Sequence, residues 1–261
     1  MYQAIPPQAD CASTWLEAVR TVEGAKGHEA HNVIIDVVDP VARTSLSDPV
    51  VSKVDDFLKT HDKKRIQTVS NTIFPAGLYR RYGAPTFFNR FHTKVLPLVR
   101  GKKRWSGYYF ERMTDLPQPD GSSINQIWDI VERIRNPSVK ALNRFELLVF
   151  DPARDVDNAS FGGQCLSFVS LKLIGPVGQR KLSMTAMYRN HFYIEKLLGN
   201  LIGLGQLMKF IADEAGVEVG QLTVISTHAE VDTGRGAWNR RDLADLIDRC
   251  DQANAQFADS A

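Results

Sequence analysis

Apolar residues recur every three to four positions in four segments of the chain, a spacing that places them on one face of a helix. These segments predict helices at 12–22, 49–59, 124–135 and 196–215. The first is expected to end at Gly24, and Ser123 is a suitable N-cap for the third. The polar tail from residue 235 onward is also predicted to be helical.

Five shorter segments are rich in β-branched and aromatic residues, which favours strands. They are 32–38, 145–150, 165–174, 182–188 and 222–226. The turn sequence at 175–178 contains two glycines and a proline, so the strands on either side of it are expected to form a hairpin.

The predicted helix at 196–215 differs from the others because it is apolar on nearly every side. Such a helix is expected to be buried centrally. Its glycines, Gly199, Gly203 and Gly205, leave room for other backbone to approach closely. No repeat, linker or boundary interrupts the pattern, so we predict a single α+β domain over 1–261.

The segment 68–112 is rich in aromatic residues, with basic residues set among them. One interpretation is a packed helical region in which arginine stems lie over aromatic rings. The other is a wall that binds a flat, anionic ligand. The pattern alone leaves both open.

Composition and charge exclude several classes of protein. Of the 261 residues 43% are hydrophobic and 24% are charged, which is typical of a globular protein and excludes disorder. The formal net charge is only +2, so no DNA partner is expected. Three cysteines stand far apart and in no metal-binding spacing, which predicts no metal site and indicates a reducing compartment.

The first ten residues lack the apolar core of a secretory signal, and no segment approaches the ~18 apolar residues of a membrane span. A cytoplasmic location is therefore expected.

Four polar residues follow one another in an informative order: Cys165 opens a strand, Arg189 ends the hairpin, Asn200 stands in the buried helix and His228 follows a later strand. The surrounding sequence reads GGQCLSFVSLKL, MTAMYRN, LLGNLIGLGQLMKFIADEAGVEVGQL and ISTHAEVD. With this order and spacing the chain resembles the family of thymidylate synthases and pyrimidine hydroxymethylases. The resemblance covers 121–232, with weaker similarity at 107–112, and leaves 1–110 as a divergent N-terminal part. It implies a three-layer fold with a large mixed sheet around a buried central helix.

The resemblance also implies chemistry. Cys165 matches the nucleophile whose thiolate adds to C6 of a pyrimidine nucleotide, which makes C5 reactive toward a one-carbon unit. Arg189 matches the arginine that binds the phosphate, and its guanidinium is expected to lower the pKa of the thiol. Asn200 matches the asparagine that reads the pyrimidine edge, where asparagine rather than an acid favours uracil.

Three further positions are implied to contact the nucleotide. His228 matches the histidine near the sugar, and Asn190 stands where the family has a hydrogen-bonding serine. Arg144 matches one of two arginines that reach the phosphate from the partner subunit, so a homodimer with shared sites is implied. Asn143 stands in place of the other arginine, so one positive charge fewer is expected to bind the phosphate.

Departures from the family pattern concern proton transfer and the folate. The family's catalytic glutamate corresponds in position to Asn71, which cannot transfer a proton, so Glu111 or Glu230 is expected to do so. Methylenetetrahydrofolate is the implied one-carbon donor. The family's short hydrophobic tail over the folate has no match in QFADSA, which leaves folate use open.

Three functions remain open at this point. The first is methylation or hydroxymethylation at C5 of a pyrimidine nucleotide through a Cys165 adduct. The second is a nucleotide-binding homologue that acts as a sensor or as a regulatory or assembly protein. The third is altered chemistry on the same scaffold, in which Glu230 accepts a hydrogen bond from a ribose hydroxyl.

Overall fold

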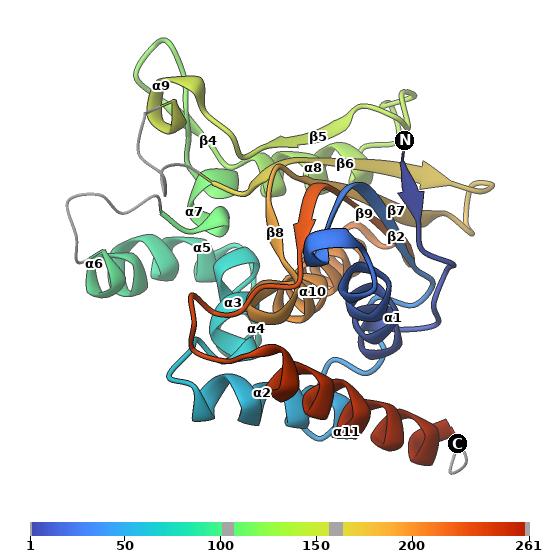
Figure 1. Cartoon of the computed structure of the whole chain (residues 1–261). Coiled ribbons are helices and arrows are strands. Elements are labelled where there is room, and N and C mark those ends of the chain that lie inside the picture. Colours follow the sequence, from blue (N-terminus) through green and yellow to red (C-terminus); the bar gives the residue numbers. More distant parts are fainter. Residues whose placement is uncertain (1, 101–106, 157–163, 259–261) are drawn as a thin grey trace.

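The computed structural model describes residues 2–100, 107–156 and 164–258 (Figure 1). Nine strands are present in this part of the chain. They are β1 Gln3–Ala4, β2 Glu29–Val37, β3 Leu116–Pro117, β4 Ser123–Ile124, β5 Phe145–Leu148, β6 Leu166–Ile174, β7 Lys181–Tyr188, β8 His191–Phe192 and β9 Glu218–Glu230.

The helices fall at all of the predicted places and at several others. They are α1 Cys11–Glu23, α2 Pro49–Thr60, α3 Ile66–Ile73, α4 Ala76–Tyr82, α5 Thr86–Arg90, α6 Leu96–Val99, α7 Tyr109–Thr114, α8 Gln126–Arg135, α9 Pro152–Asp155, α10 Leu198–Ala215 and α11 Arg240–Ala258. A 3₁₀ turn at Lys26–His28 and two π-helical turns at Phe91–Val95 and Tyr193–Leu197 complete the set.

Seven strands form one mixed sheet in the order β1-β2-β9-β7-β6-β5, with β8 paired to β9. The pairs β1/β2, β7/β9 and β8/β9 are parallel and the rest are antiparallel. The hairpin predicted from the turn at 175–178 is confirmed as β6 and β7. Strand β9 is longer than its apolar centre predicted, because pairing with both β2 and β7 extends it into half-exposed polar positions.

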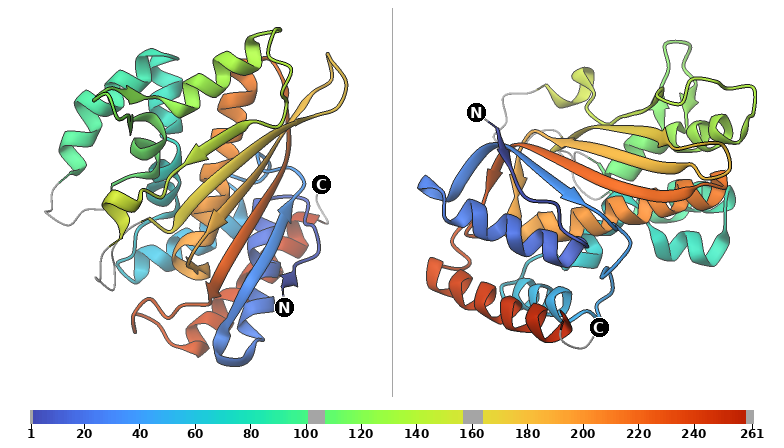
Figure 2. Two further views of the ribbon diagram at one scale, coloured as in Figure 1. Left: turned by 90° about the horizontal axis from the view of Figure 1, so that it is seen from above. Right: turned by 90° about the vertical axis from the view of Figure 1, so that its right-hand side faces the viewer.

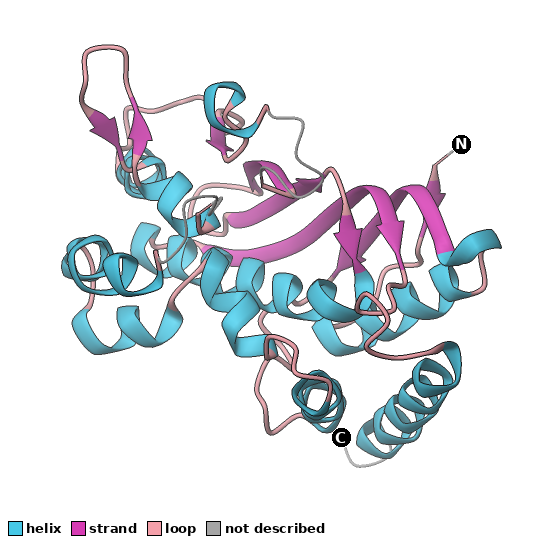
Figure 3. Cartoon of the chain, turned by 60° about the vertical axis from the view of Figure 1, so that its left-hand side comes forward, coloured by secondary structure: helices cyan, strands magenta, loops and turns pink. Residues whose placement is uncertain are grey.

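One face of the sheet is buried and the other is not. Along β2, Val33, Ile35 and Val37 are fully buried, whereas Asp36 between them is half-exposed. Helices α1 and α10 cover the buried face, and α2 and α11 pack together beneath them as an outer layer (Figures 2 and 3). The predicted α+β fold, with a large mixed sheet and a buried central helix, is confirmed. The division into one domain stays a prediction.

The described part of the aromatic segment 68–112 packs as a set of helices around a cluster of rings. Its phenylalanines form a buried cluster in which the rings of Phe74, Phe87 and Phe110 lie 5.7–5.9 Å apart. Arg81 and Arg90 place their guanidinium groups over the ring of Tyr82, so the packed helical interpretation is confirmed. The same segment also supplies two tyrosines to the candidate site described below.

The predicted cap of the third helix was wrong. Ser123 pairs in the short strand β4, and α8 begins at Gln126 instead. Asn125 provides the cap, since its Oδ1 accepts a hydrogen bond from the N–H of Trp128 at 3.0 Å. Serine and asparagine are both good N-caps. Ser123 pairs with Pro117 in the short sheet, so Asn125 is left to cap the helix.

The glycines of α10 allow the close approach that was expected. A Cβ at Gly205 would lie 1.9 Å from the carbonyl oxygen of Pro40, and one at Gly199 would lie 2.7 Å from Val69. None of the described helices is long and apolar enough to cross a membrane.

We expect Gly205→Ala to lower the free energy of unfolding by about 2 kcal/mol, because the new methyl group forces α10 away from the backbone at Pro40. Urea denaturation measures the change. Gly77→Ala is the matched control, since Gly77 lies on α4 with open space around it and should gain up to about 1 kcal/mol. Equal stability of the two variants would contradict this packing.

Candidate functional site

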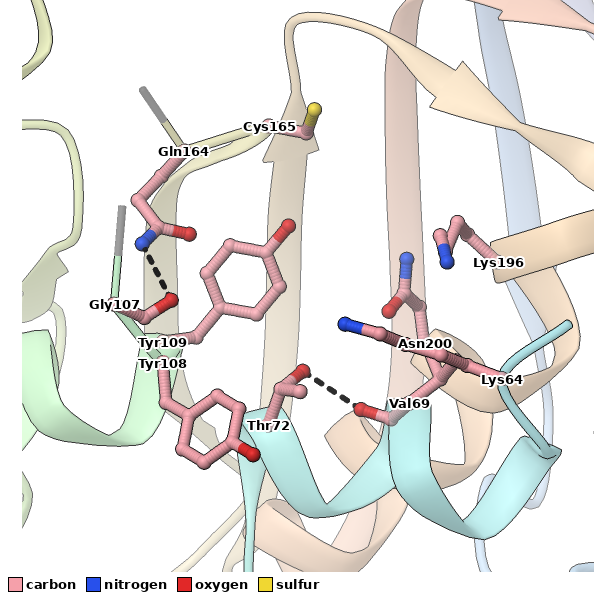
Figure 4. A pocket seen from close by; sticks show the side chains of 10 residues that line it. All are labelled: Lys64, Val69, Thr72, Gly107, Tyr108, Tyr109, Gln164, Cys165, Lys196 and Asn200. Carbon is pink, nitrogen blue, oxygen red and sulfur yellow. Dashed lines mark hydrogen bonds between the residues drawn. The ribbon is translucent and has the colours of Figure 1, made fainter. Parts of the chain in front are cut away.

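A pocket of about 280 Å³ opens where α3, the start of β6 and the start of α10 come together. Ten residues from these elements and their neighbours line it (Figure 4). They are Lys64, Val69, Thr72, Gly107, Tyr108, Tyr109, Gln164, Cys165, Lys196 and Asn200. Two residues predicted from sequence, Cys165 and Asn200, are thus brought together from segments 35 positions apart.

Cys165 stands immediately before β6, in a turn that hydrogen bonds hold from two sides. The backbone N–H of Arg189 donates to the Cys165 carbonyl at 2.9 Å, and Arg189 Nε donates to the Gln164 carbonyl at 3.0 Å. On the other side, Gln164 Nε2 donates to the carbonyl of Gly107 at 3.0 Å. The end of β7 and the start of α7 therefore fix the position of the half-buried thiol.

Opposing effects act on the pKa of the thiol. Burial raises the pKa of Cys165, while the positive charges of Arg189 and Lys196 act to lower it. Burial is the larger effect, so the neutral thiol is the favoured form in the protein alone. Arg189 acts in the direction expected from sequence, but its charge is not sufficient to bring the pKa below the ordinary value.

Asn200 lines the pocket and belongs to a buried chain of polar groups. Its Nδ2 contacts His191 Nε2 at 2.9 Å, and His191 Nδ1 contacts Ser226 Oγ at 3.0 Å. The hydroxyl of Tyr193 donates to the same Ser226 Oγ at 3.4 Å. Asn200 is only 4% exposed, and its Oδ1 has no hydrogen-bond partner among the described residues.

Two lysines bring positive charge to the pocket, and both ammonium groups turn toward it (Figure 4). Burial and the nearby charge of Lys64 lower the pKa of Lys196, whereas Glu195 at 3.4 Å raises it. The sequence analysis missed both residues. Lys196 precedes Asn200 by four positions, a spacing that places the two on one helical face and could have indicated its location.

Asp232 anchors the π-helical turn that presents Lys196. Its Oδ2 accepts hydrogen bonds from the backbone N–H groups of Ile194 at 3.0 Å and Glu195 at 3.2 Å. Burial raises the pKa of Asp232 to about 6 even though these hydrogen bonds oppose it. The hydrogen bonds therefore fix the carboxylate in place, although its charged form loses hydration on burial.

The raised pKa predicts a pH-dependent stability. Between about pH 4, the unfolded value, and pH 6, the folded protein binds the proton of Asp232 more tightly than the unfolded chain does. Its free energy of unfolding should therefore fall as the pH rises through this window, by up to about 1.4 kcal/mol per unit. Urea denaturation at pH 4, 5 and 6 measures the free energy of unfolding of the wild type and of Asp232→Asn. The wild type should lose stability relative to the variant as the pH rises, and an equal pH dependence of the two proteins would contradict the prediction.

No protein-family model matches the sequence. Comparison with curated proteins finds three named "Putative thymidylate synthase". Two of them are from Methanothermobacter marburgensis at 31% identity and from Methanopyrus kandleri at 32% identity. Each match covers 108 residues, or 41% of this chain, and 45% and 48% of the two relatives. The chain thus spans about half the length of the curated relatives it matches. The chain is a distant relative of thymidylate synthase-like proteins.

Asn71, which corresponds in position to the family's catalytic glutamate, does not line the Cys165 pocket, and neither does Glu111 or Glu230. Asn71 lines a neighbouring cavity of about 290 Å³, which shares Tyr108 with the first. Glu111 is buried behind Gly107 and forms an ion pair with Arg100. Its Oε2 has no hydrogen-bond partner within the described residues. In the described lining of the pocket, lysine and tyrosine side chains take the place of a carboxylate.

The residues expected from sequence to lie near the sugar form a separate group that does not line the pocket. His228 contacts Asn190 Oδ1 through Nδ1 at 2.6 Å and Glu29 Oε2 through Nε2 at 3.2 Å. The ring of His31 lies 5.1 Å from that of His228. Glu230 is half-buried and pairs with Glu29 across β2 and β9, so it lies at the same edge of the site.

Arg144 lies apart from both groups, exposed just before β5. Its carbonyl accepts a hydrogen bond from Arg133 at 2.9 Å. Among the described residues no group of three or more His, Cys, Asp or Glu side chains is arranged to hold a metal ion.

Proposed function

We propose that the protein binds a pyrimidine nucleotide in the Cys165 pocket and transfers a one-carbon unit to C5 of its ring. One observation carries the proposal: the half-buried thiol of Cys165 and the buried, unpaired amide oxygen of Asn200 line the same pocket. The guanidinium of Arg189 lies beside it, where its Nε donates to the carbonyl of Gln164. A thiol that only filled space would need neither of these neighbours. The distant relationship to proteins named as thymidylate synthases supports the same reaction class.

The proposed mechanism begins with the loss of the Cys165 proton. The thiolate sulfur then forms a bond to C6 of the pyrimidine, and the electron pair of the C5–C6 double bond moves toward C5 and O4. Arg189 and Lys196 stabilise the thiolate by their charges. Lys196 lines the same pocket and burial lowers its pKa, so we assign to it the acceptance and return of the proton.

The neighbouring cavity suits the one-carbon donor. Tyr108 offers it an aromatic ring, and Gln67 and Asn71 offer amide groups, a combination that fits a flat heteroaromatic ring. We assign this cavity to methylenetetrahydrofolate, which supplies the one-carbon unit when bound. Asn71 would then hold the donor instead of relaying a proton to the pyrimidine.

A homodimer with shared sites is part of the proposal. The uncovered face of the sheet presents half-exposed side chains such as Thr185 and Ile225, with Met187 37% exposed. A second copy packed on this face would bury these side chains. Arg144 is exposed at the edge of the same sheet, where it could reach the phosphate in the partner's pocket.

A nucleotide-binding homologue without methyl transfer is the second candidate. The observation that favours it is the lack of a carboxylate in the described lining of the pocket. A ribonucleotide substrate is a variant of the first candidate, motivated by Glu230 at the sugar edge. The cytoplasmic location expected from the sequence stays a prediction. The three cysteines are free thiols in the structure.

Product analysis separates these candidates. UMP, dUMP, CMP and dCMP are each incubated with the protein and methylenetetrahydrofolate, and the nucleotides are then analysed by chromatography and mass spectrometry. A gain of one CH₂ indicates methylation, and a gain of CH₂O indicates hydroxymethylation. Tight nucleotide binding in a parallel titration without any product would contradict the transferase function and support the binding protein.

A further inference from the structure

We infer that His191 is a positioning residue for the pocket: by fixing which end of the Asn200 amide faces the ligand, it makes the pocket select a uracil ring over a cytosine ring. The inference rests on the proposed function, because it concerns the ring that the same pocket binds. It adds a residue that the sequence analysis did not identify as part of the site.

The histidine is held rigidly behind the asparagine. His191 is 1% exposed, and its ring stacks on Tyr188 at 4.1 Å with an angle of 11° between the planes. The ring of Tyr193 meets it edge-on at 5.6 Å. Hydrogen bonds to Ser226 and Asn200 occupy its two nitrogens. The imidazole therefore has no room to turn over.

The protonation of the ring sets the direction of these hydrogen bonds. Burial lowers the pKa of His191 to about 3, so the ring is neutral at pH 7 and carries one proton. Because Asn200 turns Nδ2, a donor, toward Nε2, that nitrogen acts as the acceptor. The proton therefore lies on Nδ1, where Ser226 Oγ accepts it at 3.0 Å.

An asparagine amide can read either pyrimidine, depending on which way it points. With its oxygen opposite N3 it accepts from the N3–H of uracil, and its nitrogen donates to O4. Rotated by 180°, it donates to the bare N3 of cytosine and accepts from the amino group. The rotated amide would place its oxygen against the unprotonated Nε2 of His191, so two acceptors would face each other.

The free oxygen of Asn200 agrees with the first arrangement. Asn200 Oδ1 is buried and unpaired among the described residues, although buried carbonyl groups normally have a partner. An N–H from the ligand supplies that partner, and uracil has one at N3. Cytosine offers a lone pair there, so its binding leaves the oxygen opposed by another acceptor.

Two measurements on the full chain test this inference. The first is titration of dUMP, UMP, dCMP and CMP into the wild type, His191→Phe and His61→Phe. Phenylalanine keeps the ring shape at 191 but removes both nitrogens. His61 is the control because it packs on Phe57 and Trp238, away from the lining of the pocket. We expect the wild type and His61→Phe to bind the uracil nucleotides at least about 30-fold more tightly than the cytosine nucleotides. We expect His191→Phe to reduce this ratio to about 3-fold or less.

The second measurement is the ¹⁵N chemical shift of the His191 ring nitrogens, assigned by comparison with His191→Phe. A proton on Nδ1 supports the inference, whereas a proton on Nε2 overturns it, because the amide would then present its nitrogen to the ligand. Retention of the full ratio in His191→Phe overturns it as well. If no pyrimidine nucleotide binds the wild type, the proposed function fails, and the ring shifts decide the orientation of the amide by themselves.

Discussion

Replacing Cys165 by serine is expected to reduce the exchange of the pyrimidine C5 hydrogen with solvent by roughly 10³-fold or more. When the sulfur bonds to C6, C5 becomes a carbon base and takes a proton from solvent. Loss of the original hydrogen and departure of the sulfur then return the nucleotide unchanged except for its isotope. Incubation of the nucleotide in D₂O, followed by mass spectrometry, measures the exchange without any folate.

The other two cysteines provide the control for this prediction. Cys250 is fully buried, and burial raises its pKa to about 12, so its thiol is unreactive at pH 7. Cys250→Ala should therefore keep the exchange rate of the wild type. Cys11 is buried in the same way and donates a hydrogen bond to the carbonyl of Pro40. Equal exchange in Cys165→Ser and the wild type would show that the reaction, if present, does not pass through this sulfur.

Replacing Arg189 by methionine is the second substitution with a large expected effect. Its guanidinium is matched to the nucleotide phosphate, and hydrogen bonds between charged partners contribute about 1.5–3 kcal/mol each. We expect the affinity for a nucleoside monophosphate to fall by about 100-fold. Calorimetric titration measures this loss, and the affinity for the corresponding nucleoside, which lacks the phosphate, should change by less than about 3-fold.

Arg189 also acts on the pKa and the position of the Cys165 thiol, so Arg189→Met should change a second measurable property, the reactivity of the thiol. Loss of the guanidinium removes one charge that lowers the pKa of Cys165 and one hydrogen bond to Gln164. Alkylation of the thiol by iodoacetamide should therefore require a higher pH in Arg189→Met than in the wild type. Arg241→Met is the matched control, because Arg241 is exposed on α11, outside the lining of the pocket, and its loss should leave the alkylation profile unchanged. Equal loss of nucleotide and nucleoside affinity would place Arg189 away from the phosphate.

The fold could be predicted from sequence where one strong pattern acted alone. The all-round apolar segment predicted the buried helix α10, and the glycine-rich turn predicted the hairpin of β6 and β7. Prediction was weaker where contacts with other segments determine the secondary structure of a residue. The polar ends of β9 are strand because two other strands pair with them, and Ser123 lost the capping role to Asn125 because it pairs with Pro117.

The candidate site shows the same division. The resemblance to the thymidylate synthase family selected Cys165, Arg189 and Asn200, which the structure gathers around one pocket and the turn beside it. The supporting residues carried no comparable signal. Lys64 belongs to a basic run typical of a solvated surface, and His191 is a single polar residue after a strand. Their contributions depend on contacts between distant segments, which a linear pattern does not contain.

The central claim is that Cys165 forms a covalent bond with a pyrimidine nucleotide. Its most direct test is the intact mass of the protein after incubation with 5-fluoro-dUMP or 5-fluoro-UMP, each with and without methylenetetrahydrofolate. We predict a mass increase equal to nucleotide plus folate in the wild type and none in Cys165→Ser, and the nucleotide that reacts identifies the sugar. An unchanged mass under all four conditions, with nucleotide binding retained, would contradict the claim.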